Sequence, residues 1–288
     1  MSTRAEPVTP AMLRSWPLSK DAASKDDRGT VLVVGGARRT PGAAMLTGLA
    51  ALRAGAGRLT LAVAESAAIA TAVAVPESGV IGLPENPDGS VRGDAASALA
   101  DDLGAADVVV VGPGLDDADE TATLLGRLAP LVRSETAIVL DAYALGVLVD
   151  LEDVYRQWAG RLVLTPNPTE ALRLLGRDGV EMSAAVPEIA QKYQAVVTGQ
   201  GIIADPVGGW WEVAAGNAGL GTSGSGDVLA GAVGGFLARK ATPAQAACWG
   251  TYLHATAGDR LASAMGPLSF LARELLDAFP QVLAELNT

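Results

Sequence analysis

The chain has 288 residues, of which 49% are hydrophobic and 18% are charged, a composition typical of a globular protein with a large buried core. Its formal net charge of -11 argues against nucleic acid or an anionic membrane as a partner, because no surplus of basic residues can neutralise phosphates. We expect a cytoplasmic protein, because the lone Cys248 cannot form an internal disulfide, the N-terminus lacks an export-signal pattern, and no apolar stretch reaches the roughly 18 to 20 residues of a bilayer span.

Short apolar runs rich in Val, Ile and Leu recur along the chain, and each predicts a strand that is buried on both faces. Ala-rich and Leu-rich stretches with helical spacing separate most of these runs, as at residues 43–55. This alternation predicts an α/β fold with a mostly parallel sheet and helices on both of its faces. No repeat or low-complexity linker interrupts the pattern, so we expect one domain over residues 30–288, after a loosely held lead-in of residues 1–29. The predicted strands are residues 31–34, 58–63, 107–112, 137–141, 161–165 and 195–198.

The pattern changes after Thr198. Residues 201–205 and 210–215 predict two short antiparallel strands, which a turn at residues 206–209 connects. Helices are expected to complete the chain, within residues 226–239, 243–262 and 268–278.

Glycine, proline or acidic residues follow five of the predicted strands. In an open parallel sheet, ligands bind beyond the carboxyl ends of the strands. Turn chemistry can account for each of these segments alone, but their shared position predicts a binding site at that edge of the sheet. The segments are GGARRTPGAA (35–44), GPGLD (112–116), DAYAL (141–145), PNPTE (166–170) and GQG (199–201).

The segment GTSGSGDVLAG, residues 221–231, places glycines around one carboxylate, Asp227, where a helix is expected to begin. Backbone N–H groups of the turn and the positive end of the helix dipole form an anion site that fits a phosphate. Asp227 can then act as the base toward a substrate hydroxyl. The alternative is that Asp227 is only the N-cap of the helix. A Walker A loop is excluded, because no lysine follows a glycine in the chain.

Six segments, in order along the chain, resemble the ADP-dependent NAD(P)H-hydrate dehydratases, a branch of the ribokinase-like superfamily. The resemblance implies a ribokinase-like three-layer sandwich that forms a homo-oligomer. It also implies repair of hydrated NADH or NADPH, in which ADP or ATP phosphorylates the ring hydroxyl and loss of phosphate completes the removal of water, with Mg2+ assisting. The segments are residues 35–63, VVVVGPGL (108–115), VLDAYAL (139–145), LTPNPTE (164–170), GTSGSGDVLAG (221–231) and YLHATAGD (252–259).

The resemblance implies roles for particular residues as well. Asp227 is expected to contact the substrate hydroxyl as its base. The remaining site residues form three groups, for the transferring phosphate, the hydrated dinucleotide and the adenine nucleotide. They are, in that order, Gly224, Ser225 and Gly226; Ala44, Gly114 and Asn167; and Thr198, Gly199, Gln200, Gly201 and Ile202.

Four positions depart from the residues that the family usually has. The family usually has Asp at Tyr143, His at Asn167, Lys at Thr198 and Gly at Ser223. Phosphoryl transfer depends on nearby charges, and two of these changes remove one. A catalytically impaired nucleotide-binding relative is therefore one alternative function.

Asn167 and Glu170 form an Asn-x-x-Glu pattern, which resembles the magnesium-linked motif of ribokinase-like small-molecule kinases. Glu170 can hold Mg2+ through water, and Asn167 can donate to a phosphate. The pattern favours a second alternative function, a kinase of a small hydroxylated metabolite. A structural alternative for the pair is a capping box at a helix start.

Other polar and aromatic residues carry weaker signals. His254, the only histidine, is expected to be a hydrogen-bonded core residue rather than a catalytic one. Trp210 and Trp211 are adjacent in an expected strand, so at most one of them can cover an adenine. Arg38 and Arg39 follow the first strand, either as solvated charges or as partners of a substrate phosphate.

Overall fold

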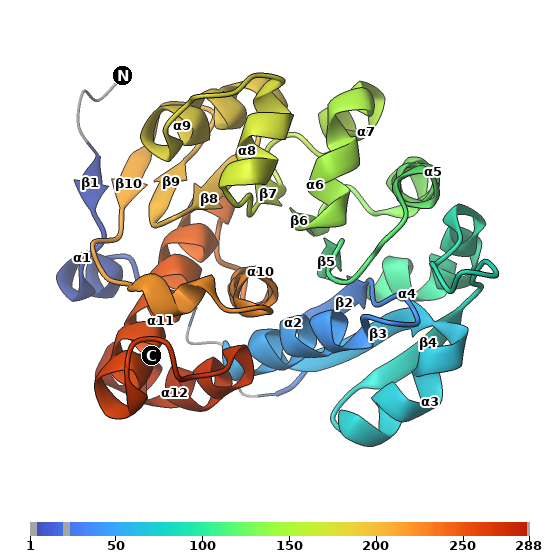
Figure 1. The fold of residues 1–288 in the computed structure, drawn as a ribbon, viewed down its shortest axis with the longest axis horizontal. Coiled ribbons are helices and arrows are strands. Elements are labelled where there is room, and N and C mark those ends of the chain that lie inside the picture. The colour runs from blue at the N-terminus through green and yellow to red at the C-terminus, as the bar shows by residue number, and fades with distance from the viewer. Residues whose placement is uncertain (1–4, 20–23, 287–288) are drawn as a thin grey trace.

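The computed structural model describes residues 5–19 and 24–286, so residues 1–4 and 20–23 of the expected lead-in lie outside it. Its centre is a ten-stranded sheet with the order β1-β10-β9-β8-β7-β6-β5-β2-β3-β4 (Figure 1). β9 is antiparallel to both of its neighbours, and the other neighbouring strands are parallel. The strands are β1 Glu6–Pro7, β2 Thr30–Val34, β3 Arg58–Ala64, β4 Gly79–Leu83, β5 Val108–Val111, β6 Ala137–Leu140, β7 Leu162–Leu164, β8 Val196–Gly199, β9 Ile202–Ala204 and β10 Trp210–Glu212.

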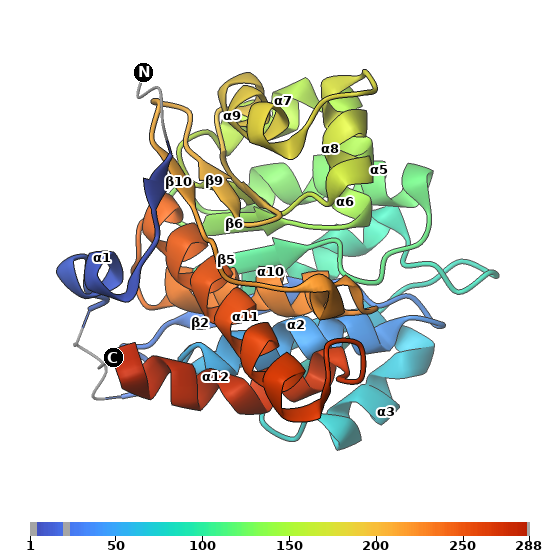
Figure 2. The same ribbon diagram turned by 60° about the vertical axis from the view of Figure 1, so that its left-hand side comes forward.

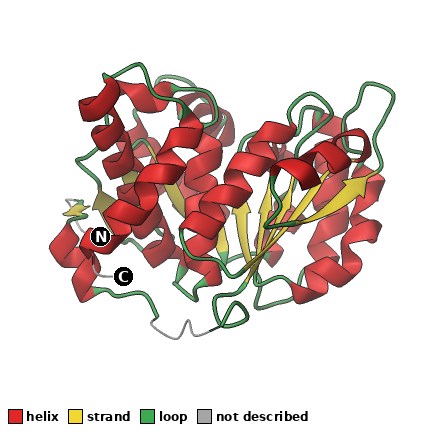
Figure 3. Ribbon diagram, turned by 90° about the horizontal axis from the view of Figure 1, so that it is seen from below, coloured by secondary structure: helices red, strands yellow, loops and turns green. Residues whose placement is uncertain are grey.

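Helices cover both faces of the sheet, which confirms the expected three-layer α/β architecture (Figure 3). Within the described residues, no helix combines the length and the apolar character needed to cross a bilayer. The α-helices are α1 Pro10–Ser15, α2 Pro41–Arg53, α3 Glu65–Ala74, α4 Ala100–Ala105, α5 Ala118–Leu128, α6 Tyr143–Val147, α7 Glu152–Gln157, α8 Pro168–Leu175, α9 Met182–Tyr193, α10 Ser225–Ala238, α11 Pro243–Met265 and α12 Ala272–Leu286. The 3-10 helices are η1 Gly93–Leu99, η2 Ala129–Leu131, η3 Leu148–Asp150 and η4 Ala218–Gly221.

Alternate residues of the central strands enter two separate cores. In β2, Val31 and Val33 belong to the core that α2, α10, α11 and α12 cover, and Leu32 and Val34 belong to the core on the opposite face. Successive side chains of a strand point to opposite faces, so one apolar run fills both cores. This confirms the prediction of strands that are buried on both faces.

The structure departs from the expected elements in three places. The sequence does not predict β4, because two glycines interrupt its short apolar run at the edge of the sheet. α12 continues through Pro280, with buried residues on both sides of the proline, whereas the sequence predicts a helix at 268–278. The expected looseness of the lead-in is wrong for residues 5–19, because β1 pairs with β10 and Leu13 of α1 is fully buried.

α10 approaches α2 at backbone contact distance. A Cβ atom added to Gly231 would lie 2.0 Å from the carbonyl oxygen of Thr47, and one added to Gly235 would lie 2.4 Å from that of Ala51. Both distances are far below van der Waals contact, so only glycine fits at these positions. Because the two glycines lie about one turn apart on α10, they set the spacing of the two helices and thereby the place of the α10 N-terminus.

Substitution of Gly231 by alanine is expected to destabilise the protein by about 2 kcal/mol or more, because the two helices must move apart. Gly126→Ala, in the exposed part of α5, is the matched control, since a Cβ there meets nothing within 4 Å. The control should stabilise the helix by about 0.5–1 kcal/mol. Urea denaturation measures both free energies of unfolding. Equal effects of the two substitutions would contradict the steric argument.

Candidate active site

The loops that follow β2 and β5 lie side by side at the carboxyl end of the sheet. These strands are neighbours although the chain forms β3 and β4 between them, and such a switch point is where open α/β sheets bind ligands. The N–H groups of Gly36 and Ala37 donate to the carbonyl oxygens of Pro113 and Gly114, both at 2.8 Å. The Thr40 hydroxyl also donates to the Gly114 carbonyl, at 2.7 Å. The first two of the predicted strand-end segments are therefore joined directly.

The two expected substrate-site residues of this region differ in exposure. Gly114 is half-buried in the junction between the loops. Ala44 is fully buried on α2, close to Gly36, so its side chain faces protein. The Ala44 side chain therefore cannot contact a ligand, and a ligand there could contact only the backbone of the first turn of α2.

The start of α10 has the features of an anion site. Its N-cap is Gly224, with a φ of 89°, and no side chain caps the helix. Among the described residues, the N–H groups of Gly226 and Asp227 have no acceptor in the protein. Gly226 is exposed, and a Cβ atom added to it would meet nothing within 4 Å. Free N–H groups at the positive end of a helix dipole attract a phosphate.

Asp227 lies in the first turn of α10, three residues after the N-cap, so the interpretation of Asp227 as the N-cap is wrong. Its carboxylate has no hydrogen-bond or ion-pair partner among the residues that the structure describes. The pKa of Asp227 is raised to about 7, mainly by burial and in addition by the charges of Asp141 and Glu170. A carboxyl group with this pKa exchanges its proton near neutral pH, as a general base requires.

Asp141 is a second carboxylate of the site, and the sequence analysis did not include it among the site residues. It directly follows β6, is only 5% exposed, and accepts a hydrogen bond of 2.7 Å from the Thr165 hydroxyl. Burial raises the pKa of Asp141 to about 6. The next residue, Ala142, has a φ of 50°, a strained conformation of the kind that gathers at functional sites. The position of Asp141 at a strand end was the available signal.

Glu170 is the third carboxylate, and it also completes a capping box with Asn167. The Asn167 N–H donates to the Glu170 carboxylate at 2.9 Å, and the Glu170 N–H donates to the Asn167 side chain at 3.0 Å. The structural interpretation of Asn-x-x-Glu is therefore confirmed. Burial raises the pKa of Glu170 to about 7, and the charge of Asp141 adds to the shift. Glu170 thus caps α8, and it also interacts electrostatically with Asp141 and Asp227.

The three carboxylates come from separate parts of the chain: Asp141 follows β6, Glu170 is in α8 and Asp227 is in α10. The charge of Asp141 raises the pKa of both Glu170 and Asp227, and that of Glu170 also raises the pKa of Asp227. Carboxylate oxygens suit Mg2+, which usually keeps several of its waters. No cluster of three His, Cys, Asp or Glu side chains that could ligate an ion directly occurs among residues 5–19 and 24–286.

The segment of residues 198–202 forms the connection from β8 to β9. Gln200 and Gly201, with φ values of 50° and 81°, make the turn at the carboxyl end of β8. Thr198 is fully buried, and its hydroxyl shares a hydrogen bond of 2.6 Å with that of Thr251 in α11. The side chain of Thr198 is therefore enclosed by protein and is not exposed at the turn.

The remaining candidates have protein partners. His254 is buried and shares a hydrogen bond of 2.9 Å with the Ser225 hydroxyl, so the expectation of a hydrogen-bonded histidine is confirmed. Arg38 forms an ion pair with Glu85 and donates to the Pro87 carbonyl at 3.2 Å. The Arg38 guanidinium therefore already has partners within the protein.

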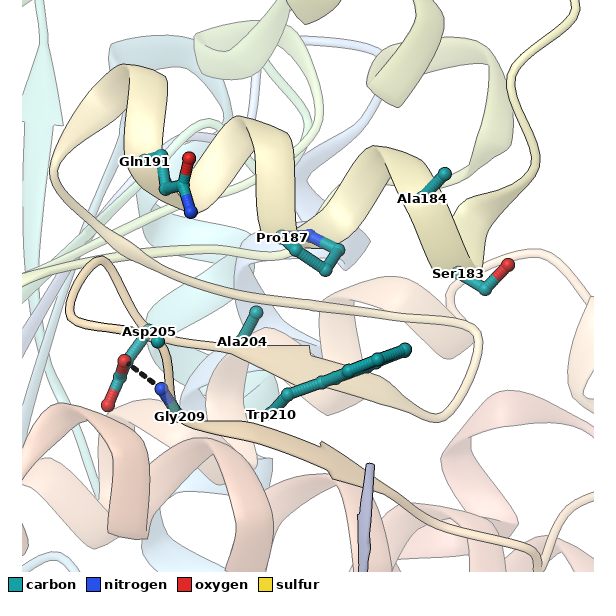
Figure 4. Close-up of a pocket in the computed structure, with 9 residues that line it drawn as sticks. Ser183, Ala184, Pro187, Gln191, Ala204, Asp205, Gly209 and Trp210 are labelled. Carbon is teal, nitrogen blue, oxygen red and sulfur yellow. Dashed lines mark hydrogen bonds between the residues drawn. The ribbon is translucent and has the colours of Figure 1, made fainter. Parts of the chain in front are cut away.

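A cavity of about 440 Å³ lies between α9 and the β9–β10 hairpin (Figure 4). Trp210 lines it, whereas Trp211 packs against Trp16 with ring centroids 6.2 Å apart, so the two tryptophans face opposite sides as expected. None of the lining residues belongs to the glycine-rich and acidic segments described above. The cavity is therefore separate from the carboxylates. Its lining residues are Ser183, Ala184, Pro187, Gln191, Ala204, Asp205, Gly208, Gly209 and Trp210.

Known proteins share the sequence and fold that produce this site. The family model described as NAD(P)H-hydrate dehydratase matches residues 31–281. The ADP-dependent (S)-NAD(P)H-hydrate dehydratase of Xanthomonas campestris is 44% identical over 98% of this chain and 98% of its own length. The chain belongs to the NAD(P)H-hydrate dehydratase family.

Other family members are longer or more distant. A bifunctional NAD(P)H-hydrate repair enzyme of Moorella thermoacetica is 39% identical over 97% of this chain, which spans 54% of that enzyme. The ADP/ATP-dependent NAD(P)H-hydrate dehydratase of Bacillus subtilis, co-crystallised with ATP and Mg2+, has a TM-score of 0.79 and 25% identity, over 99% of this chain and 100% of that chain. A ribokinase-like superfamily protein of Enterococcus faecalis has a TM-score of 0.83 and 22% identity, over 99% of this chain and 98% of its own, so the fold is ribokinase-like.

Asp227→Asn is expected to stabilise the protein at pH 8 by up to about 4 kcal/mol, the equivalent of the shift in pKa, since asparagine places no charge beside the other two carboxylates. The folded-state pKa is raised from 3.8 to about 7, so the folded state holds the proton more tightly and the parent protein loses stability as the pH rises through that window. The gain should therefore disappear at pH values below the unfolded pKa. Denaturant unfolding across this pH range measures it. A gain that does not depend on pH would contradict the electrostatic cause.

Proposed function

We propose that this protein dehydrates hydrated NADH and NADPH, with ADP as the phosphoryl donor. The observation that carries the proposal is the start of α10, where free backbone N–H groups lie beside a carboxylate without a partner. Such a pairing provides a phosphate site next to a base. The ADP-dependent relative from X. campestris, which aligns with nearly the whole chain, supports the same substrate and nucleotide.

Asp227 takes the proton of the ring hydroxyl in this mechanism. The hydroxyl oxygen attacks the terminal phosphorus of ADP, the bond from that phosphorus to the bridging oxygen breaks, and AMP leaves with the bonding electrons. The ring phosphate then leaves with the C–O electrons, and the ring loses a proton from the neighbouring carbon and regains its double bond. The sum is the removal of water from the substrate and the conversion of ADP to AMP and phosphate.

Backbone N–H groups of Gly226 and Asp227 are the donors for the transferring phosphoryl group. The N–H of Ser225 already donates to the Thr222 carbonyl at 3.2 Å, and the Ser225 hydroxyl bonds to His254. Ser225 therefore supports the phosphate site from behind. The dipole of the 14-residue helix adds electrostatic attraction at the same point.

The adenine nucleotide is proposed to contact residues 199–202. Gln200 is exposed, and the turn that it forms with Gly201 lies at the carboxyl end of β8, the edge of the sheet where the carboxylates lie. Thr198 supports this turn indirectly, because its hydrogen bond to Thr251 holds the end of β8 against α11.

The hydrated dinucleotide is proposed to lie along Gly114 and Asn167, with its ring hydroxyl at Asp227. Both Gly114 and Asn167 have exposed atoms. Ala44 is buried, so we propose that it supports the first turn of α2 and does not contact the dinucleotide itself. A cytoplasmic location and a homo-oligomeric state stay predictions from the sequence.

Magnesium is proposed to be held by the nucleotide phosphates and, through water, by Glu170, with the charge of Asp141 behind it. Burial raises the pKa of Asp141, and burial together with the charge of Asp141 raises the pKa of Glu170, so a nearby cation would stabilise both carboxylates. When bound, the ion neutralises charge that develops on the phosphoryl oxygens.

Asp227→Ala should lower turnover by a factor of about 10³ or more, because the substitution removes the proposed acceptor of the hydroxyl proton. Nucleotide affinity should remain, since the backbone donors are unchanged. Recovery of reduced-nicotinamide absorbance from hydrated NADH, with ADP and Mg2+, measures the rate, and titration calorimetry measures ADP binding. A variant as active as the parent would remove Asp227 from the mechanism.

The same assay separates the alternative functions. A phosphorylated hydrate that accumulates without dehydration would indicate a small-molecule kinase. Nucleotide binding without any turnover would indicate an impaired relative. Either result contradicts the proposed dehydratase.

Glu170→Gln should raise the Mg2+ concentration for half-maximal activity about tenfold, because a neutral amide orients the waters of the ion less strongly. Glutamine also completes a capping box, so the cap should remain, and removal of a charge whose folded-state pKa is raised should not destabilise the protein near pH 8. Glu274→Gln is the matched control, since Glu274 likewise accepts a backbone N–H at a helix start, from Leu271 at 2.7 Å. An unchanged Mg2+ requirement in Glu170→Gln would contradict the proposed metal role.

A further inference from the structure

The first turn of α10 lacks the side-chain cap that several other helices have. In α5, α8 and α11, the N-cap side chains of Asp117, Asn167 and Thr242 each accept a backbone N–H of the first turn. The N-cap of α10 is Gly224, which has no side chain for this purpose. A cap contributes about 0.5–2 kcal/mol, so the start of α10 forgoes a stabilising contact.

The missing cap keeps the phosphate donors free. A capping oxygen binds the N–H of the second or third residue of a helix, which in α10 are Gly226 and Asp227. A helix end without a cap or a ligand frays. The turn therefore needs an anchor that leaves its N–H groups unused.

His254 provides such an anchor from α11. Its Nε2 and the Ser225 hydroxyl share a hydrogen bond of 2.9 Å, and the two residues are only 8% and 3% exposed. Ser225 is the first residue of α10, so the bond ties the first turn to the middle of a 23-residue helix. Burial lowers the pKa of His254 to about 4, so the imidazole is neutral near pH 7.

The same helix also holds two other parts of the site. Thr251 shares a hydrogen bond of 2.6 Å with Thr198, at the end of β8. Asp259 accepts hydrogen bonds of 2.9 Å from the Gly216 N–H and from the Asn217 side chain, ahead of the glycine-rich turn. α11, which crosses α10 in Figure 2, is therefore a common support for the nucleotide turn and the phosphate turn.

We propose that His254 is a positioning residue of the active site. Through Ser225 it fixes the first turn of α10, so that the Gly226 and Asp227 N–H groups and the Asp227 carboxylate are in place before the ligand arrives. Preorganised donors need no rearrangement when charge develops in the transition state. The kinetic consequence rests on the proposed function, whereas the structural consequence can be measured without it.

His254→Phe keeps a ring of similar size and removes the hydrogen bond. We expect kcat to fall about 10- to 100-fold with little change in KM for hydrated NADH, because small displacements of reacting groups have effects of this size. His254→Gln, whose amide can bond to Ser225, should regain most of the lost kcat. The Ser225→Ala/His254→Phe double variant should be no slower than the slower single variant, since both changes delete the same bond.

Tyr193→Phe is the matched control. It also removes one buried hydrogen bond and keeps the ring, because the Tyr193 hydroxyl donates to the Leu174 carbonyl at 2.9 Å, in the core on the opposite face of the sheet. Its kcat should equal that of the parent protein. The amides of Ser225 and Val228, which donate to the carbonyl oxygens of Thr222 and Gly224, should exchange their hydrogen for deuterium faster in His254→Phe and at an unchanged rate in Tyr193→Phe.

Faster exchange at the start of α10, together with a kcat loss that His254→Gln restores, would support the proposal. An unchanged kcat in folded His254→Phe, or exchange as slow as in the control, would overturn it. A parent protein without dehydratase activity would refute the proposed function alone, and the exchange measurement would still decide whether His254 anchors the turn.

Discussion

The close contact between α10 and α2 is the constraint on which the candidate site depends. Gly231 and Gly235 bring the two helix backbones together, so α10 cannot shift without steric overlap. α10 also packs against β5 and β6, and its first turn lies near enough to Asp141 and Glu170 for their charges to raise the pKa of Asp227. Asp227 is thus forced into a space that already contains two carboxylates. Its raised pKa, and with it the capacity to act as a base near pH 7, follows from that position.

Several unfavourable features meet at this one place. A helix start has no side-chain cap, three carboxylates lose part of their hydration, and Ala142 has a φ of 50°. Features of this kind cost on the order of 1–3 kcal/mol each. The two large cores on either side of the sheet can offset such costs. A protein selected only for stability would lose these features, so their coincidence at a switch point of the sheet indicates a site where ligands bind.

Local patterns allowed much of the fold to be predicted from the sequence, but not the contacts within the site. The buried strands are evident because apolar runs such as residues 31–34 serve both cores, whereas β4 at the edge has little such signal. The strand-end segments predict where the site lies. The pairs Thr198–Thr251 and Ser225–His254 lie 53 and 29 residues apart in the chain, so only the folded arrangement reveals them. Asp141 was missed as a site residue because its raised pKa comes from burial, which a strand-end position alone does not show.

Two of the positions that depart from the family pattern, Thr198 and Tyr143, supply none of the central elements of the site. Thr198 is enclosed, and its hydroxyl is engaged by Thr251, so the interior gains a hydrogen bond where the family usually has a lysine. Tyr143 is 41% exposed, two residues after the buried Asp141. The backbone donors of α10, its dipole and Asp227 do not depend on either side chain. Because a helix N-terminus can itself supply positive charge at a phosphoryl group, the proposed chemistry does not require a lysine at position 198.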